Sequence, residues 1–224
     1  MAKQTPAAKL RRTAGEIKVY RVLMKIIPAA IATAAVLLSV VYVVTVLYSR
    51  YGSFTVQINK FDSIKYALSL DETRDFNHPT STLSMDISKE ITNIATNTLP
   101  TNLDSDQGGV HNGNNYAAYT FFCKNVGKEA VSYNYQLYIA NMTLDIEKAI
   151  RVRLYVNGEE TTFAYKSATG EAEPGTTMFH TDTVIVEKQI STVPEQVDRF
   201  TIVMWLDGDD PECLDDIIGG QLKI

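Results

Sequence analysis

The stretch RVRLYVNGEETTFAYK, residues 151–166, decides the fold of the larger part of this chain. Its apolar residues Val152, Leu154 and Val156 alternate with other residues before an Asn-Gly pair, after which the chain returns through TTFAYK. Alternation with a period of two predicts a strand with one apolar face. Asn-Gly suits a type I′ turn, because both central residues of that turn need a positive φ. The sequence therefore predicts a β-hairpin.

Further strands are predicted on both sides of this hairpin. Residues 116–142 are interpreted as a second hairpin with residues 125–129 as its connection, and the alternation in residues 52–62 predicts a strand with one buried face. Residues 182–190 and 198–206 predict two more strands, and the latter is apolar on both faces, as a central strand is. About eight or nine short strands with turns between them favour an all-β fold, an antiparallel β-sandwich of jelly-roll-like form.

Short helical signals and one long loop interrupt these strands. Residues 143–150 predict a helical turn or two, and residues 88–100 predict a helix that begins at Ser88 and ends before Pro100. Residues 99–115 are polar and show no periodicity, which predicts a long surface loop.

The 24 residues 26–49, IIPAAIATAAVLLSVVYVVTVLYS, carry no charge. At about 1.5 Å per residue, a helix over them reaches about 36 Å, enough to cross a hydrocarbon core of about 30 Å. A soluble helix that is apolar on every face needs more cover than a domain of this size provides. The stretch therefore predicts one transmembrane helix.

Charge divides the chain on either side of this span. Residues 1–25 carry seven Lys and Arg against one Glu, a net charge of +6, and residues 51–224 carry 13 Lys and Arg against 25 Asp and Glu, a net charge of −12. By the positive-inside rule, residues 1–25 form a basic cytoplasmic tail and residues 51–224 an extracytoplasmic domain. A cleaved signal peptide gives the same orientation, but its apolar region is about 7–15 residues long, so the longer stretch favours an uncleaved anchor.

The stretch MWLDGDDPECLDDIIGG, residues 204–220, concentrates carboxylates behind the single tryptophan. Calcium prefers carboxylate oxygens, and the candidate ligands for a weak extracellular site are Asp207, Asp209, Asp210 and Glu212. The alternative is structural: Asp209 or Asp210 caps a helix, Pro211 takes its first position, and the two glycines at 219 and 220 end it. No other cofactor is expected, and the sequence contains no zinc-ligand, nucleophile-elbow or phosphate-loop motif.

The two cysteines, Cys123 and Cys213, both lie in the domain expected outside the cell, where a disulfide can persist. If they pair, they close a loop of about 90 residues and stabilise the fold by about 4–5 kcal/mol in the chain-entropy model. Two separate buried thiols are the alternative.

Aromatic residues are frequent in the predicted strand around SYNYQLYI. Tyr133 and Tyr135 share one face of this strand, which makes a flat aromatic platform for carbohydrate geometrically feasible. Cross-strand packing, with the hydroxyls at the rim, is the more common use of such residues.

The strand at Phe54–Val56 after the span, followed by YTFFCKNVGKEAVSYNY at 119–135, resembles the TasA/camelysin class of Gram-positive envelope proteins. The segments NGNNYAAYTFF, RVRLYVNGEETTFAYK and TIVMWLDGDDPEC are similar to membrane-anchored surface proteins of Clostridia. The resemblance implies a jelly-roll-like sandwich at the cell surface, in a group that includes biofilm matrix fibres and a proposed protease. Two differences stand out: TasA-like chains carry a cleavable signal, whereas this chain is expected to keep its anchor, and no metal ligands here match the protease.

These features predict a single-pass bacterial membrane protein with its N-terminus in the cytoplasm and its C-terminal domain at the cell surface. The expected role is structural, adhesive or matrix-binding. Its expected partners are the lipid bilayer, a cell-wall glycan, a matrix polymer or a second copy, and the acidic domain argues against nucleic acid. Two alternatives stay open: an extracytoplasmic metal-dependent hydrolase built on the acidic cluster, and an accessory subunit of an envelope complex.

Overall fold

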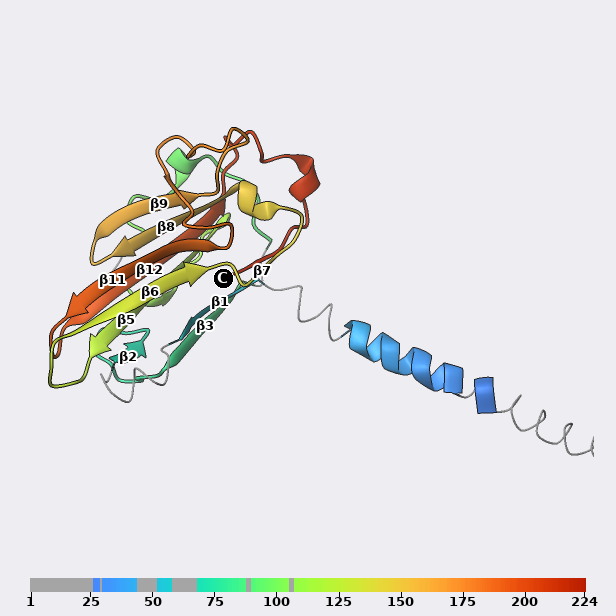
Figure 1. Cartoon of the computed structure of the whole chain (residues 1–224), viewed down its shortest axis with the longest axis horizontal. Coiled ribbons are helices and arrows are strands. Elements are labelled where there is room, and N and C mark those ends of the chain that lie inside the picture. Colours follow the sequence, from blue (N-terminus) through green and yellow to red (C-terminus); the bar gives the residue numbers. More distant parts are fainter. Residues whose placement is uncertain (1–25, 29, 44–51, 58–67, 88–89, 105–106) are drawn as a thin grey trace, which may run out of the picture. The chain divides into compact units, whose positions relative to one another are not determined.

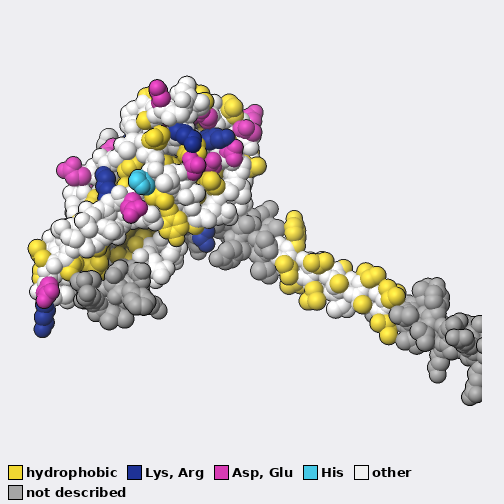
Figure 2. Space-filling model, viewed as in Figure 1, with side chains coloured by type: hydrophobic (Ala, Val, Ile, Leu, Met, Phe, Trp, Pro, Cys, Tyr) yellow, Lys and Arg dark blue, Asp and Glu magenta, His cyan; other side chains and the backbone are white. Residues whose placement is uncertain are grey.

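The structure, a computed structural model, describes residues 26–28, 30–43, 52–57, 68–87, 90–104 and 107–224. The chain divides into two compact units, Met1–Arg50 and Tyr51–Ile224. In the first unit the described element is the helix Ile26–Val43, which is long and apolar enough to cross a membrane. Its apolar side chains cover the face of the helix seen in Figure 2. The predicted span continues to residue 49, and residues 44–49 lie outside the described residues.

The second unit consists mainly of antiparallel strands (Figure 1). Its largest sheet has seven strands in the order β10–β9–β8–β12–β5–β2, with β4 also paired to β5. In that order the strands are Thr177–Met178, Glu159–Ala164, Ile150–Val156, Val197–Leu206, Tyr116–Asn125 and Leu68–Asp71, and β4 is Gly109–Val110. The pairing of β9 with β10 is parallel and covers two residues. The fold is therefore mostly β, as predicted.

The hairpin predicted at residues 151–166 is formed by β8 and β9. Asn157 and Gly158 have φ angles of 53° and 94°, so both central residues of the turn take the left-handed conformation that a type I′ turn requires. β12 lies between β8 and β5 and is buried on both faces, which confirms the predicted central strand at residues 198–206.

Three two-stranded sheets complete the unit. β6 (Val131–Tyr138) pairs with β11 (Val184–Thr192), β1 (Gly52–Gln57) with β3 (Thr82–Ile87), and β13 (Leu222–Lys223) with β7 (Asn141–Met142). Strands β6 and β1 contribute to the same core as the large sheet: the Tyr135 ring packs edge-on against Phe200 at 5.4 Å, and Phe54 lies 5.7 Å from Tyr119. These contacts cover one face of the large sheet.

The opposite face of the large sheet carries a second, smaller core. Leu99 and Leu103 pack there against Val203 and Trp205. The helix predicted at residues 88–100 is wrong over its described part, residues 90–100, where the helical structure is one 3-10 turn, Thr96–Thr98. The segment loses its helix because its apolar residues are used to cover the sheet.

The prediction of a polar surface loop at residues 99–115 is also wrong in part. Leu103 is buried, and Asp104 accepts hydrogen bonds from the Arg199 guanidinium at 2.6 Å and from the Thr201 hydroxyl at 3.0 Å. These side-chain hydrogen bonds to two residues of β12 hold Asp104 against the sheet.

The second predicted hairpin is a further correction, because β5 and β6 do not pair with each other. β5 joins β12 and β2 in the large sheet, whereas β6 joins β11. The turn between them crosses from one sheet to the other and is held by Asn125, whose side chain donates to the Glu129 carbonyl at 2.9 Å and accepts from the Gly127 N–H at 2.9 Å. β5 is buried on both faces and β6 on one, so the two strands belong in different environments.

The helical turn predicted at residues 143–150 is confirmed by the 3-10 helix Ile146–Lys148. The helix predicted to begin at Pro211 is wrong. The helical structure in that region is the 3-10 helix Asp215–Ile217, which follows Leu214 and has no side-chain cap. Asp210 Oδ1 accepts from the Glu212 N–H at 2.7 Å, as a capping residue does, but no helix follows it, and its Oδ2 is bound to a buried arginine, described below.

Candidate functional site

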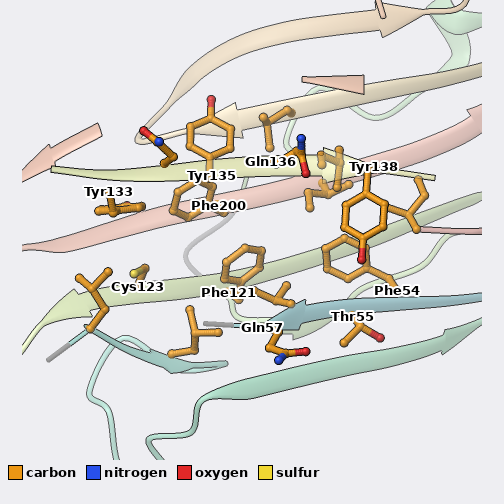
Figure 3. A pocket seen from close by; sticks show the side chains of 18 of the residues that line it. Phe54, Thr55, Gln57, Phe121, Cys123, Tyr133, Tyr135, Gln136, Tyr138 and Phe200 are labelled. Carbon is orange, nitrogen blue, oxygen red and sulfur yellow. The ribbon is translucent and has the colours of Figure 1, made fainter. Parts of the chain in front are cut away.

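A cleft of about 1070 Å³ lies between β6 on one side and β1 and β2 on the other (Figure 3). Its floor is formed by side chains of the large sheet, among them Phe121, Leu154, Phe200 and Ile202. Of its 23 described lining residues, Lys223 is the only one with a charged side chain. The domain as a whole carries a net charge of −12, so a cleft whose described lining has no acidic side chain differs from the rest of the domain.

One wall of the cleft is an unpaired edge of β6. Within the described part of the chain, β6 pairs along Val131–Tyr138 with β11 alone. The Ile139 N–H donates to Thr183 on the β11 side at 2.7 Å, and the next N–H, of Ala140, donates to Lys223 on the cleft side at 2.7 Å. Backbone groups alternate in direction along a strand, so the N–H groups of Ser132, Asn134, Gln136 and Tyr138 also point to the cleft side.

The C-terminal strand closes one end of the cleft. β13 pairs antiparallel with β7, and the carbonyl of Lys223 accepts from Ala140 at the end of β6. On its other side, the Ile224 carbonyl accepts a hydrogen bond from the Thr55 N–H of β1 at 3.2 Å. This short strand thus bridges the two walls, and the cleft continues from where it stops.

At the other end of the cleft lie Cys123 and Tyr133, which Figure 3 shows side by side. The Tyr133 hydroxyl donates to Asp198 at 2.9 Å, and Asp198 also accepts from Asn157 at 3.0 Å and Gln196 at 2.9 Å. Burial raises the pKa of the Cys123 thiol to about 12, with the charge of Asp198 adding to the effect. The thiol is therefore protonated at neutral pH and is a poor nucleophile.

Two of the three tyrosines of β6, Tyr133 and Tyr135, serve packing, and Tyr138 is exposed. Tyr133 is tied to Asp198, and Tyr135 packs against Phe200, so both face the large sheet. Of the two alternatives for these residues, an aromatic platform for carbohydrate and cross-strand packing, the structure favours packing.

The two cysteines are free thiols, and the disulfide between them is not formed. Cys123 lies opposite Asp198 at the beginning of β12, whereas Cys213 follows the far end of that strand. Eight residues of strand separate those ends by about 25 Å, far more than a disulfide spans. The Sγ of Cys213 accepts instead from the Asn93 side chain at 3.6 Å.

The acidic cluster surrounds a buried arginine. The Arg151 side chain, on β8, is almost fully buried, and its Nη2 lies 2.5 Å from Asp210 Oδ2 and 3.8 Å from Glu173 Oε2. Its Nε lies 3.3 Å from Asp207 Oδ2. A charged guanidinium thus neutralises part of the negative charge that these carboxylates bring into the interior.

Glu212 joins the cluster from the side. Glu173, Asp210 and Glu212 place carboxylate oxygens within 4.8 Å of one another, and Glu212 also accepts from the Ala168 N–H at 2.8 Å. Its hydrogen bond with Asp210, together with burial, raises the pKa of the Glu212 carboxyl. The bond to Ala168 ties the loop between β9 and β10 to the segment after β12.

Of the four predicted calcium ligands, the structure brings Asp207, Asp210 and Glu212 into one cluster and leaves the side chain of Asp209 exposed. Sequence reasoning missed Glu173 and Arg151. An arginine inside an otherwise apolar strand is the signal that could have found the cluster, because a buried guanidinium needs acidic partners. The calcium site itself stays a prediction.

Comparison with known proteins adds no relative from which a function could be transferred. No protein-family model, no curated protein and no solved structure matches the chain. The resemblance to the TasA/camelysin class therefore stays a prediction.

Proposed function

We propose that this chain is a membrane-anchored bacterial cell-surface protein whose β domain binds a partner through the cleft beside β6. The apolar helix Ile26–Val43, with seven cations in the 25 residues before it, supports anchoring with the N-terminus in the cytoplasm. The domain after the span is then outside the cell. The observation that carries the proposal is the edge of β6 that no described strand pairs, beside a cleft whose described lining has Lys223 as its one charged residue.

We infer that the domain is a jelly-roll-like sandwich. In this arrangement the large sheet forms one layer, and the β6–β11 and β1–β3 sheets form the other. The ring contacts of Tyr135 with Phe200 and of Phe54 with Tyr119 support two facing layers with a shared core. The cleft is then the place where the second layer has a gap between β6 and β1.

The chemistry of the cleft supports binding without turnover. Its described lining contains no His, Asp or Glu. The carboxylate that meets the Tyr133 hydroxyl, Asp198, is itself buried and already accepts hydrogen bonds from Tyr133, Asn157 and Gln196. Exposed strand edges and apolar clefts are typical of surfaces that hold another chain. A structural, adhesive or matrix-binding role follows.

The metal-dependent hydrolase is the second candidate, and the acidic cluster is the one feature that favours it. In that cluster Arg151 already lies between Asp207, Asp210 and Glu173. A cation bound to the same oxygens would have to compete with a guanidinium, which makes a catalytic metal centre the weaker proposal.

Two measurements test the proposed function. Protease added to intact cells should remove the domain, and the purified full chain in detergent should retain a partner from the cell envelope without consuming it. A domain that resists protease in whole cells but is digested after lysis contradicts the orientation. Chelator-sensitive cleavage of a peptide or glycan by the purified chain contradicts the binding role.

A further inference from the structure

Resting on the proposed binding role, we propose that the occupant of the cleft is an extended peptide segment that adds to β6 as a new strand. The segment runs antiparallel to β6, covers about eight residues, and has uncharged apolar side chains at the alternate positions that face the floor of the cleft. We infer these properties of the segment from the free edge of β6, the direction of β13 and the side chains that line the cleft.

The edge of β6 offers the hydrogen bonds that an added strand needs. Four N–H groups, of Ser132, Asn134, Gln136 and Tyr138, and the carbonyls of the same residues point to the cleft side by the alternation of the strand. A peptide strand can satisfy both donors and acceptors along this edge. An acyl chain satisfies neither, which is why a peptide is favoured over a lipid as the occupant.

Direction and length follow from the strand that already bridges one end. β13 runs antiparallel to β7, which continues the course of β6, and its Lys223 carbonyl bonds the same edge of β6 at Ala140. A segment in line with β13 therefore runs antiparallel to β6. It reaches the end of the edge after the eight residues of Val131–Tyr138.

The side chains of β13 and Ile224 show which residues the segment needs. Ile224 is buried in the core formed by both layers, Leu222 packs against the same core, and Lys223 between them is only partly buried. Continued along the cleft, the inward positions meet the floor of Phe121, Phe200 and Leu70. Because the described lining carries no acid, a charged inward residue would lose its hydration without a partner, so the inward positions take uncharged apolar side chains.

The test uses the full chain in detergent micelles and a fluorescent peptide, acetyl-Thr-Val-Thr-Ile-Thr-Val-Thr-Ile-amide, followed by anisotropy. The expected result is saturable binding that the same peptide without its fluorophore competes away. Two control peptides should bind at least about tenfold more weakly. One has the four apolar residues in a single block, and the other carries N-methyl groups on the threonine amides.

A matched pair of variants separates this edge from the outer edge of the same sheet. Asn134→Pro removes one N–H on the cleft side of β6, and Glu187→Pro removes one on the far side of β11, since neither residue bonds across the β6–β11 ladder. Asn134→Pro should weaken peptide binding about tenfold, and Glu187→Pro should change it less than about twofold. Melting temperatures of both variants control for folding.

Equal binding of the N-methylated peptide, loss of binding in Glu187→Pro alone, or no binding of any peptide by the folded chain would overturn the inference. A co-purified lipid that the peptide cannot displace would also overturn it. The proposed function fails separately, because it depends on protease access in intact cells and on retention of an envelope partner, whatever the chemistry of that partner.

Discussion

Replacing Arg151 with methionine should destabilise the domain more than any other single change in its charged residues. Arg151 is 3% exposed, and its guanidinium lies 2.5 Å from Asp210, 3.3 Å from Asp207 and 3.8 Å from Glu173. Methionine keeps much of the volume, so the main loss is electrostatic: buried carboxylates without a counter-charge. Removing one partner of a buried ion pair costs about 3–5 kcal/mol, and the variant should lose that amount at neutral pH.

The loss should shrink in acid. Without Arg151 the neutral form of the buried carboxyls is favoured, so their pKa values rise in the folded variant. A folded state that binds protons more tightly than the unfolded chain gains stability as the pH falls. The difference in unfolding free energy between wild type and Arg151→Met should therefore be smaller at pH 5 than at pH 7.

Urea unfolding in detergent, followed by fluorescence of Trp205, measures this difference, because Trp205 is the single tryptophan and is 1% exposed. The control is Arg153→Met in the same strand. Arg153 stacks over Trp205 at 5.3 Å and pairs with the half-exposed Glu160, so its loss should cost only about 1 kcal/mol. A loss below about 1 kcal/mol for Arg151→Met at neutral pH would refute the reasoning, because buried carboxylates that lose their positive partner should cost more than that.

Three further outcomes are expected from the same regions. Glu212→Gln should flatten the dependence of the unfolding free energy on pH. Because the pKa of Glu212 is raised in the folded state, its protonation stabilises the fold in acid, and this stabilisation is lost as the pH rises from the ordinary value of 4.5 through the raised pKa. Melting temperatures of wild type and variant across that pH range measure the effect. Added calcium should leave the melting temperature unchanged, because Arg151 already supplies positive charge in the cluster, and a rise with calcium concentration would restore the calcium hypothesis. Cys123 should react with thiol reagents far more slowly than Cys213 at pH 8, since its pKa is about 12, as mass spectrometry of labelled peptides can show.

The parts of the fold that depend on neighbouring residues could be predicted from the sequence. The hairpin at residues 151–166 is specified by its own alternation and by one Asn-Gly turn, and the burial of residues 198–206 on both faces is visible in their composition. The uncharged stretch at residues 26–49 likewise needs no tertiary contact to be interpreted.

Pairing between distant strands could not be predicted in the same way. Residues 116–138 contain two strands joined by a short turn, which is the pattern of a hairpin, yet β5 and β6 enter different sheets. What separates them is the difference in burial between the two strands, which depends on the layers that cover them. The cleft arises from the same layering, and no local pattern marks it.

The acidic stretch shows an intermediate case. The sequence indicated that Asp207, Asp210 and Glu212 act together, but it predicted that they cap a helix or bind calcium. The group at the centre is Arg151, which lies 56 residues before Asp207 in the chain and beside it only through the pairing of β8 with β12. Capping signals depend on neighbouring residues alone, so they cannot predict a contact between residues this far apart in the sequence.

The most direct test of a binding role for the cleft is photo-crosslinking in intact cells. A photoreactive residue is placed at Gln136, beside the cleft, or at Glu187, which lies outside the described lining of the cleft. Position 136 should give an adduct with a defined peptide segment of a partner, mapped by mass spectrometry, and position 187 should not. Adducts of equal yield at both positions, or none at position 136 while the domain is folded and exposed to protease, would contradict binding through this edge.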